Sequence, residues 1–339
     1  MTIYDFAVNC DNDKEERFIT LLKEHCRKRK LSFLWIRKEN VRETVRQLEA
    51  HEIRIDLMLD MEATYHKPKD IYARVCYAVK DAGGAVINDP DRARMAIDKS
   101  VAHFELVNAE IPTPYTVVVR NWEPLKFKLS DEERSSLGSP FVIKPALGFA
   151  QKGVVREAKG TVQEIARARN FDKGDNFLLQ ERVDPVTLNG KRAWFRVLHI
   201  FDTIIPCWWD DQRSFYEHVT SKEFESLNLA PVVKIASRIA SLSRMAWFST
   251  EIAAEKKEDG RRFVTVDYIN DQCDLTTQSE SPKGVPDKIV EYVAEKFTSV
   301  ARAPDPARAA APKYKVLLKD TVLDVKGLGS PQALIRQEK

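Results

Sequence analysis

Cysteine and long apolar runs are both scarce in this sequence. The five cysteines are odd in number and widely spaced, and none forms a CxxC pair or has a histidine at metal-ligand spacing, so we interpret them as reduced core thiols. They are Cys10, Cys26, Cys76, Cys207 and Cys273. No stretch approaches the ~20 apolar residues of a membrane span, and the N-terminus lacks a basic segment followed by an apolar one. We therefore expect a cytoplasmic protein with no membrane partner.

Net charge is also small, since 54 basic residues are nearly balanced by 51 acidic ones to give +3. Such a balance produces no field strong enough to indicate a nucleic-acid partner, so any basic site must be local. With 43% hydrophobic and 31% charged residues, the composition excludes a fibrous or largely disordered chain. At 339 residues the chain is long enough for two or three domains.

Up to residue 88 the sequence alternates between strand-like and helix-like periods. Alternating strands and helices imply right-handed crossovers and a parallel sheet covered on both faces, so this part predicts an α/β layer. The predicted strands are residues 3–9, 31–36, 53–61 and 85–88, and the predicted helices are 13–30, 39–51 and 68–82.

After residue 88 the pattern changes to α+β. A helix is predicted from Asp89 or Asp91, with Pro90 in its first turn, a break near Asp98 and a second helix from Lys99. Long strands at hairpin spacing then predict an antiparallel sheet. They are residues 111–119, 141–144, 153–157, 176–183, 191–201, 203–209, 246–254 and 261–269, with helices near 161–170 and 231–244 and a loop or short helix at 121–139. Three prolines in 303–312 predict a linker, followed by a hairpin or pairing arm.

One short stretch, "SPFVIKPALGFAQKGVVRE", puts Lys144 at the end of a β-branched strand and directly before a loop with Gly148 and Gly153. The simplest interpretation is a hairpin with a lysine at its rim. However, Lys99 begins a helix, and the distant segment "FVTVDYIND" ends a strand in acidic residues. Lysines neutralise phosphate, backbone amides cradle it, and carboxylates hold Mg²⁺, so these parts together suit a magnesium nucleotide.

From about Asp89 to Arg302, this ordered series of motifs resembles the ATP-grasp superfamily, which includes D-alanine:D-alanine ligase and the ligase that adds glutamate to a ribosomal protein. The resemblance implies a pre-grasp α/β domain at 1–88, an ATP-grasp N-lobe at 89–183, a C-lobe at 184–303, and a linker and tail at 304–339. It also implies ATP and Mg²⁺ as cofactors. The implied reaction is ADP-forming carboxylate-amine ligation through an acyl phosphate, with a small-molecule carboxylate and an amine as substrates.

The resemblance also assigns roles to residues of the nucleotide site. Lys99 and Lys144 would bind phosphate, and Lys144 would also act in catalysis and reach the adenine. Gly148 and Gly153 would allow positive φ and close backbone approach in a flexible flap over the triphosphate. The segment "LLQERV" (178–183) matches the hinge between the two ATP-grasp subdomains. There Gln180 or Glu181 would meet the adenine amino group, and the backbone of Arg182 and Val183 would meet the ring nitrogens.

The metal and substrate residues follow the family pattern less closely. Glu251, Asp267 and Asn270 would hold the metal, but Asp267 and Asn270 are three residues apart instead of two, so either the strand bulges or Asp271 or Asp274 replaces Asn270. Arg196 would lie near the transferred phosphate. Arg213 is interpreted either as a clamp for a substrate carboxylate or as part of a solvated loop.

A kinase of the same architecture and a non-catalytic nucleotide-binding module are the alternative functions, and a homodimer is an assembly that we consider. Four tryptophans are assigned to the core or a pocket wall, namely Trp194, Trp208, Trp209 and Trp247. His199, between Leu198 and Ile200, is expected to be a packed core histidine.

Overall fold

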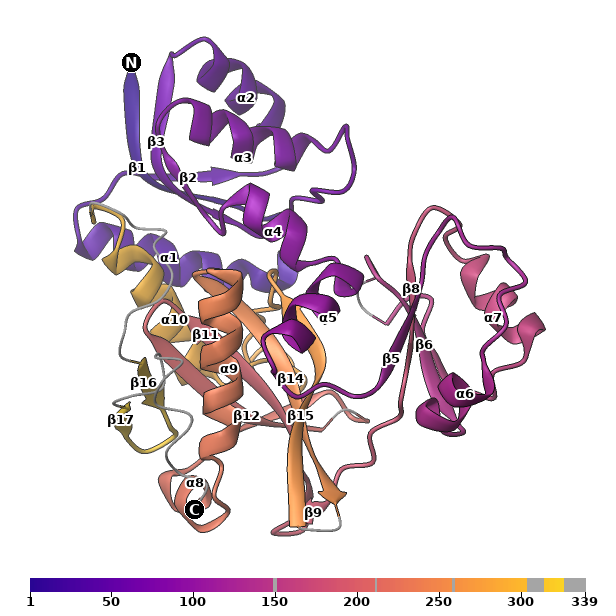
Figure 1. Ribbon diagram of the computed structural model, residues 1–339. Coiled ribbons are helices and arrows are strands. Elements are labelled where there is room, and N and C mark those ends of the chain that lie inside the picture. Colours follow the sequence, from indigo (N-terminus) through magenta and orange to yellow (C-terminus); the bar gives the residue numbers. More distant parts are fainter. Residues whose placement is uncertain (149–150, 211, 258–259, 304–313, 326–339) are drawn as a thin grey trace. The chain divides into compact units, whose positions relative to one another are not determined.

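The computed structural model describes residues 1–148, 151–210, 212–257, 260–303 and 314–325. The chain combines parallel and antiparallel sheets with helices, as predicted (Figure 1). Most of the predicted linker at 303–312 lies outside the described residues. In the described ranges, every helix is too short or too polar to cross a membrane.

The chain folds into two units, each with its own interior. The first contains residues 1–94, 195–249 and 270 onward, and the second contains residues 95–194 and 250–269. Strands β11 (Trp194–Ile200), β14 (Trp247–Lys257) and β15 (Gly260–Asn270) have residues in both units. The boundary therefore runs along strands and does not coincide with a linker.

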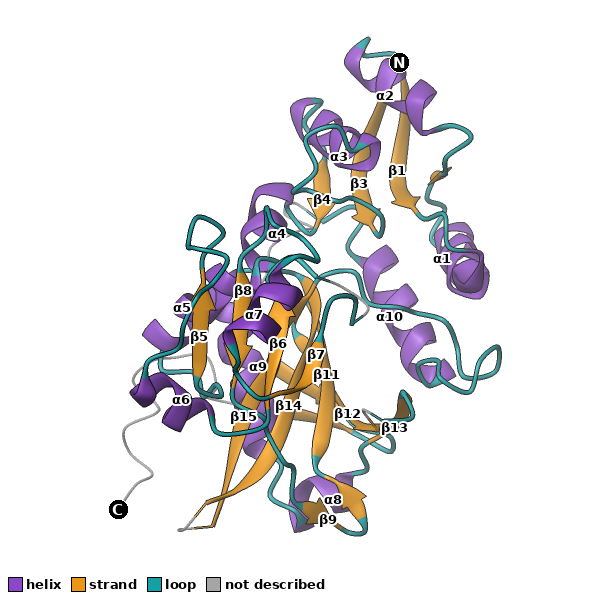
Figure 2. Cartoon of the chain, turned by 90° about the vertical axis from the view of Figure 1, so that its right-hand side faces the viewer, coloured by secondary structure: helices purple, strands orange, loops and turns teal. Residues whose placement is uncertain are grey.

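The first unit begins with a four-stranded parallel sheet in the order β2-β1-β3-β4, which confirms the predicted α/β layer. Right-handed crossovers in this order put α1 on one face and α2 and α3 on the other, as Figures 1 and 2 show. The strands are β1 (Thr2–Asn9), β2 (Phe33–Ile36), β3 (Ile53–Asp60) and β4 (Ala85–Ile87); the helices are η1 (Asp13–Glu15), α1 (Glu16–Lys28), α2 (Val41–Glu49) and α3 (Ile71–Asp81). Phe6 and Leu57 are fully buried between the layers.

The rest of the first unit is built around β12 (Thr203–Asp210), which pairs antiparallel with β11 and β13 (Phe215–His218). β16 (Tyr314–Leu317) pairs parallel with β12 and antiparallel with β17 (Val322–Val325), so the predicted hairpin also acts as a pairing arm. The helices are α8 (Ser221–Ser226), α9 (Ala230–Ser243) and α10 (Asp287–Ser299). α10, which was not predicted, packs on α1 through Phe18 and Phe297, whose ring centroids are 6.4 Å apart.

The second unit holds a four-stranded antiparallel sheet in the order β5-β8-β6-β7, also as predicted. Its strands are β5 (Thr116–Val119), β6 (Phe141–Pro145), β7 (Val155–Ala158) and β8 (Phe177–Gln180), and its core includes Phe141, Ile143 and Ile165. The helices are α4 (Pro90–Ala96), which straddles the boundary, α5 (Lys99–Asn108), α6 (Asp131–Leu137) and α7 (Val162–Arg169). Two short strands, β9 (Thr187–Leu188) and β10 (Lys191–Arg192), precede β11.

β14 pairs with β15, consistent with the hairpin spacing of the two predicted strands, and β15 ends the strand order β15-β14-β11-β12-β16-β17. A strand at the end of a sheet has backbone groups without a strand partner. On β15, the Thr265 amide donates to the Pro112 carbonyl at 2.8 Å, and the Val266 carbonyl accepts from the Lys144 side chain. A predicted site residue, Lys144, thus binds at this edge of β15.

Candidate functional site

Lys144 lies at the end of β6 and is only 8% exposed. Its ammonium donates to the Val266 carbonyl at 2.9 Å and lies 5.3 Å from the centroid of the Tyr268 ring. Burial lowers the pKa of Lys144 to about 8; nearby Asp267 and Glu251 oppose this shift, and Lys99 adds to it. Lys144 is therefore a buried cation that interacts with the other predicted lysine and with both predicted metal-binding acids.

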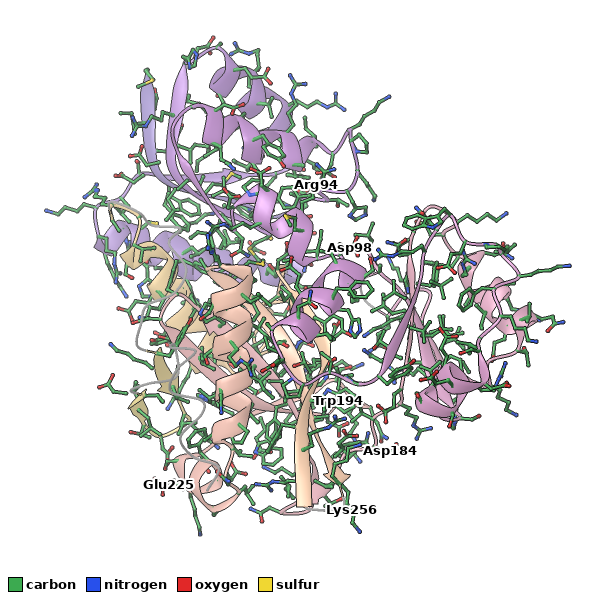
Figure 3. The ribbon with its side chains drawn as sticks, in the orientation of Figure 1. Arg94, Asp98, Asp184, Trp194, Glu225 and Lys256 are labelled. Carbon is green, nitrogen blue, oxygen red and sulfur yellow. The ribbon has the colours of Figure 1, made fainter. Side chains whose placement is uncertain are left out.

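Lys99 is placed by the start of α5. Asp98 lies at the start of this helix (Figure 3). Its carboxylate caps the helix by accepting from the amides of Ser100 at 2.8 Å and Val101 at 3.3 Å. The Lys99 amide donates to the Ala146 carbonyl at 3.1 Å, and its ammonium donates to the Gly148 carbonyl at 2.8 Å. The helix start and the glycine loop after β6 are thus joined, which brings the two lysines into the same site.

The two glycines of this loop are required for different reasons. Gly153 has φ +74°, and a Cβ there would lie 2.6 Å from the Phe171 ring, so both positive φ and close approach apply. Gly148 does not have positive φ, contrary to expectation. A Cβ on Gly148 would instead lie 2.4 Å from Cγ of Pro145, so close approach alone requires this glycine. Residues 149 and 150 of the predicted flap lie outside the described residues.

Asp175 and Asn176, which were not predicted as site residues, hold the base of the glycine loop. The Leu147 amide donates to Asp175 Oδ2 at 2.9 Å, the Ala146 amide to the Asn176 carbonyl at 2.8 Å, and the Asn176 side chain to Ser100 Oγ at 2.9 Å. Burial raises the pKa of Asp175 to about 6. The signal available from sequence was position: these residues directly precede β8, which pairs with the end of β6.

Glu251 on β14 and Asp267 on β15 come from neighbouring strands. Thr250 Oγ1 donates to the Asp267 carbonyl at 3.0 Å across these strands, and Trp194 Nε1 donates to Glu251 Oε2 at 3.0 Å. Both acids are half-buried, and both raise the pKa of Lys144, so their carboxylates lie within electrostatic reach of the same ammonium.

This donor set fits Mg²⁺. Magnesium prefers oxygen ligands and is commonly held by one or two carboxylates together with substrate phosphates. In the described ranges, no cluster of three or more His, Cys, Asp or Glu side chains is arranged as a metal site. A magnesium ion at this site would therefore be held by two protein carboxylates together with phosphate oxygens of a bound nucleotide.

The third predicted metal ligand, Asn270, is the last residue of β15 and belongs to the first unit. In a regular strand, side chains three residues apart point to opposite faces, so its assignment still depends on a bulge after Asp267. Asp274, an alternative, lies near Glu15 in the first unit, where burial and the Asp274 charge raise the pKa of Glu15 to about 7. The Asp274 carboxylate also accepts from the Thr276 amide at 2.9 Å.

The predicted hinge residues make contacts of their own. Gln180 Nε2 donates to the Tyr268 hydroxyl at 2.9 Å and to Thr116 Oγ1 at 3.2 Å. Glu181 exchanges hydrogen bonds with the backbone of Tyr115, donating at 2.8 Å and accepting at 3.1 Å. Their partners are thus protein groups on β15, on β5 and directly before β5.

The next two hinge residues differ in environment. Arg182 forms ion pairs with Glu157 at 2.9 Å and Asp184 at 3.1 Å. Val183 is buried and packs with Ala253 and Val264 in a small apolar cluster. The segment therefore passes from a charged surface to the core between adjacent residues.

Tyr268 and His103 were not predicted as site residues. The Tyr268 hydroxyl is 2.8 Å from His103 Nδ1, the two rings stack with centroids 5.7 Å apart, and the same hydroxyl accepts from Gln180. Burial, with the Lys144 charge, lowers the pKa of His103 to about 4, so this imidazole is neutral at physiological pH. One buried hydroxyl thereby links α5, β8 and β15, the elements that carry Lys99, Gln180 and Asp267.

Solved structures with a similar fold were found, while no protein-family model and no curated protein sequence matches the chain. A RimK domain ATP-grasp protein from Sphaerobacter thermophilus has a TM-score of 0.55 and 18% identity over 86% of this chain and 98% of its own. The D-cycloserine synthetase DcsG has a TM-score of 0.59 and 15% identity over 88% and 100%. The chain has the ATP-grasp fold.

The similarity extends to other ATP-grasp structures. The D-alanine–D-alanine ligase of Bacillus anthracis, in complex with ATP, has a TM-score of 0.54 and 16% identity over 82% of this chain and 88% of its own. These matches span nearly the whole of each neighbour. The resemblance that the motifs indicated is therefore confirmed at the level of the fold.

Arg196, which the ATP-grasp resemblance places near the transferred phosphate, and Arg213, interpreted as a carboxylate clamp or part of a solvated loop, both lie in the first unit. Arg196 on β11 stacks over Trp209, with its guanidinium carbon 5.0 Å from the ring centroid, and lies 5.9 Å from that of Tyr216. Arg213 lies in the turn between β12 and β13, with its side chain 84% exposed and Nε 3.7 Å from Asp210 Oδ2. Arg196 is thus fixed among aromatic rings, and Arg213 is open to a ligand.

The two predictions about core residues hold within the ATP-grasp fold. Trp208, Trp209 and Trp247 are buried, and Trp194 is partly buried against the apolar cluster beside Val183. His199 is fully buried, and burial lowers its pKa to about 4. It packs as a neutral ring against Phe248, with centroids 4.9 Å apart.

Proposed function

We propose that this protein is an ATP-dependent carboxylate-amine ligase that forms an amide or peptide bond and releases ADP and phosphate. The observation that carries the proposal is the group of two lysines and two carboxylates in the second unit: Lys144 interacts with Lys99, Asp267 and Glu251. Two cations beside two magnesium-type ligands suit a triphosphate and its metal better than they suit any neutral ligand. The structural neighbours add support, since they include ligases of the same fold.

In the proposed reaction, a substrate carboxylate attacks the γ-phosphate to give an acyl phosphate, and an amine then displaces phosphate. Lys99 and Lys144 neutralise the phosphate oxygens, and Arg196 stabilises charge on the transferred group. Asp267 and Glu251 hold Mg²⁺, with Asn270 joining them if β15 bulges. The metal, when bound, supplies charge neutralisation at the phosphates. Most of the rate enhancement then comes from positioning and electrostatics.

The proposal also places the adenine, the glycine loop and the domains. We place the adenine at the hinge, where Gln180 or Glu181 meets its amino group and the backbone of Arg182 and Val183 meets its ring nitrogens. The glycine loop with Gly148 and Gly153 lies over the phosphates. Residues 1–88 act as a pre-grasp domain, 89–183 and 184–303 as the two ATP-grasp lobes, and 304–339 as a linker and tail.

The first experiment measures ATP affinity by calorimetry in the presence of Mg²⁺. Lys144→Ala should abolish binding and leave the melting curve nearly unchanged. The matched control is Lys126→Ala, which removes an exposed lysine from the same unit. Unchanged ATP affinity in Lys144→Ala would contradict the proposal.

A second experiment addresses the reaction. Amino acids, small carboxylates and short peptides are screened in pairs for ADP release, with free phosphate and the amide product measured together. A ligase gives equal amounts of ADP, phosphate and amide. A phosphorylated product without free phosphate would instead identify a kinase, and ATP binding without turnover across the screen would favour a non-catalytic nucleotide-binding module.

A further inference from the structure

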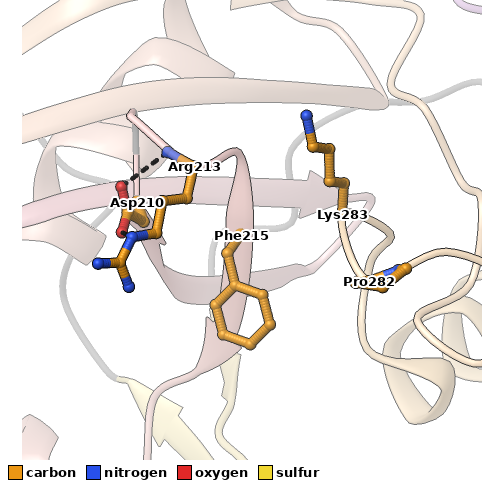
Figure 4. A pocket seen from close by; sticks show the side chains of 5 residues that line it. All are labelled: Asp210, Arg213, Phe215, Pro282 and Lys283. Atoms are coloured by element: carbon orange, nitrogen blue, oxygen red, sulfur yellow. Dashed lines mark hydrogen bonds and ion pairs between the residues drawn. The ribbon is translucent and has the colours of Figure 1, made fainter.

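The first unit contains a pocket of about 380 Å³ next to Arg213 (Figure 4). It is lined by Asp210, Arg213, Phe215, Pro282 and Lys283, which come from the β12–β13 turn and from a turn that follows β15. This volume is within the range of roughly 300–1,000 Å³ that is usual for small-molecule sites. Its basic residues stand on opposite sides of an aromatic ring, as Figure 4 shows.

The β12–β13 turn positions Arg213, whose side chain is 84% exposed. Asp210 Oδ1 accepts from the amides of Gln212 at 3.0 Å and Arg213 at 2.9 Å, so this carboxylate fixes the turn. Its other oxygen lies 3.7 Å from Arg213 Nε, which is longer than a hydrogen bond. The two terminal guanidinium nitrogens point away from Asp210 (Figure 4) and can bind a carboxylate in a bidentate manner.

The opposite turn is equally well fixed. The Gln278 amide donates to the Val285 carbonyl at 2.9 Å, and the Gln278 side chain donates to the Tyr216 carbonyl of β13 at 2.7 Å. A Cβ on Gly284 would lie 2.4 Å from the Thr277 carbonyl oxygen, so only glycine fits behind Lys283. Within the described part of the chain, Lys283 has no acidic partner. A lysine without an ion-pair partner among the described residues therefore lines the pocket.

We propose that this pocket binds an organic acid: its carboxylate contacts Arg213 and Lys283, and its apolar part lies on Phe215 and Pro282. Two cations and one acid leave the pocket positive, which selects an anion. Phe215 is 44% exposed, and covering its ring removes apolar surface from water, which selects an anion with a hydrophobic substituent over inorganic phosphate. The inference rests on the proposed function, in which this acid is one of the two substrates.

The test uses the nucleotide-free, full-length protein and three probes in calorimetric titrations. N-acetylleucine carries both a carboxylate and an apolar side chain, N-acetylleucinamide lacks the charge, and acetate lacks the apolar part. We expect N-acetylleucine to bind more tightly than either of the others. Arg213→Ala and Lys283→Ala should each weaken its binding about tenfold, as expected for loss of one charge-assisted hydrogen bond.

The control is Lys222→Ala, which removes an exposed lysine on α8 in the same unit and should leave binding unchanged. Equal binding of the amide and the acid, or equal binding by wild type and both pocket variants, would overturn the inference. ATP affinity of the same samples separates the two proposals. If ATP binds in a Lys144-dependent manner and N-acetylleucine does not bind, only the pocket assignment fails. If N-acetylleucine binds through Arg213 and Lys283 and ATP does not, the ligase proposal fails.

Discussion

Replacing Lys144 with methionine should remove a pH-dependent penalty from the stability of the second unit. The pKa of Lys144 is about 8 in the folded protein and 10.5 for an ordinary lysine, a difference that corresponds to about 3 kcal/mol. Below pH 8 the amine is charged in both the folded and the unfolded chain, so the folded protein carries the full cost of burying it. Above about pH 10.5 the amine is neutral in both states, and the cost disappears.

Between these two pH values Lys144 binds more protons in the unfolded chain than in the folded one, so its contribution to the free energy of unfolding rises with pH. Relative to Lys144→Met, the rise should amount to about 3 kcal/mol. The absolute difference near neutral pH is smaller, because the variant also leaves the Val266 carbonyl without its Lys144 donor, which costs about 1–3 kcal/mol. The pH dependence separates the two effects, since a neutral lysine still donates to that carbonyl.

Urea unfolding, followed by tryptophan fluorescence from about pH 7 to about pH 10.5, measures this difference at each pH. Taking wild type minus Lys144→Met removes the contributions of all other titrating groups. Lys126→Met, at an exposed position in the same unit, should show no such pH dependence. If the wild-type and Lys144→Met curves stay parallel across the whole range, Lys144 is not a buried charge and the reasoning about the site is wrong.

Three other changes test separate parts of the site. Asp267→Asn should remove most Mg-dependent turnover, because it removes one of the two carboxylates proposed to hold the metal; turnover close to wild type would exclude Asp267 as a ligand. Gly153→Ala should destabilise the protein by about 1–2 kcal/mol because of the positive φ, and by more if the Phe171 ring cannot move away from the new Cβ. The control is Gly138→Ala in the same urea titrations. Gly138 has φ +68°, and a Cβ there would have nothing within 4 Å, so this variant reports the cost of positive φ alone. Asp175→Asn should raise the melting temperature above pH 6, where the buried carboxylate is charged, and change it little below pH 3.8; a difference that is the same at all pH values would contradict the raised pKa.

Much of the fold was predictable because local periodicity decided it. The four parallel strands of the first unit lie within a few residues of the predicted ranges, since strands buried on both faces read as continuous apolar runs. The break near Asp98 was visible because an N-cap residue precedes Lys99. By contrast, α10 was missed although Ile289, Val293 and Phe297 recur at helical spacing and are buried. The helical periodicity of α10 was therefore present in the sequence, whereas tertiary contacts leave no such local pattern.

The rest of the site depends on contacts that no local pattern contains. His103 and Tyr268 are 165 residues apart, and nothing in either segment indicates that their side chains meet. Asp175 stands in the polar turn "FDKGDN", which predicts a solvated carboxylate, yet tertiary packing buries it beneath the glycine loop. Gly148 shows a third limit, because sequence identifies a required glycine without distinguishing positive φ from close approach.

The contacts of Lys144 explain how a buried lysine can stay protonated and still have N–H donors left for a phosphate. A buried ammonium without partners would lose its proton or destabilise the fold. Here a free carbonyl at the edge of β15 accepts one of its hydrogen bonds, the Tyr268 ring faces it, and the charges of Asp267 and Glu251 partly restore its pKa. These groups keep the lysine largely protonated near neutral pH while leaving it two further N–H donors. A triphosphate that accepts from those donors would raise the pKa of Lys144 again. Nucleotide binding would therefore offset the free energy that burial of the charged lysine costs the folded protein.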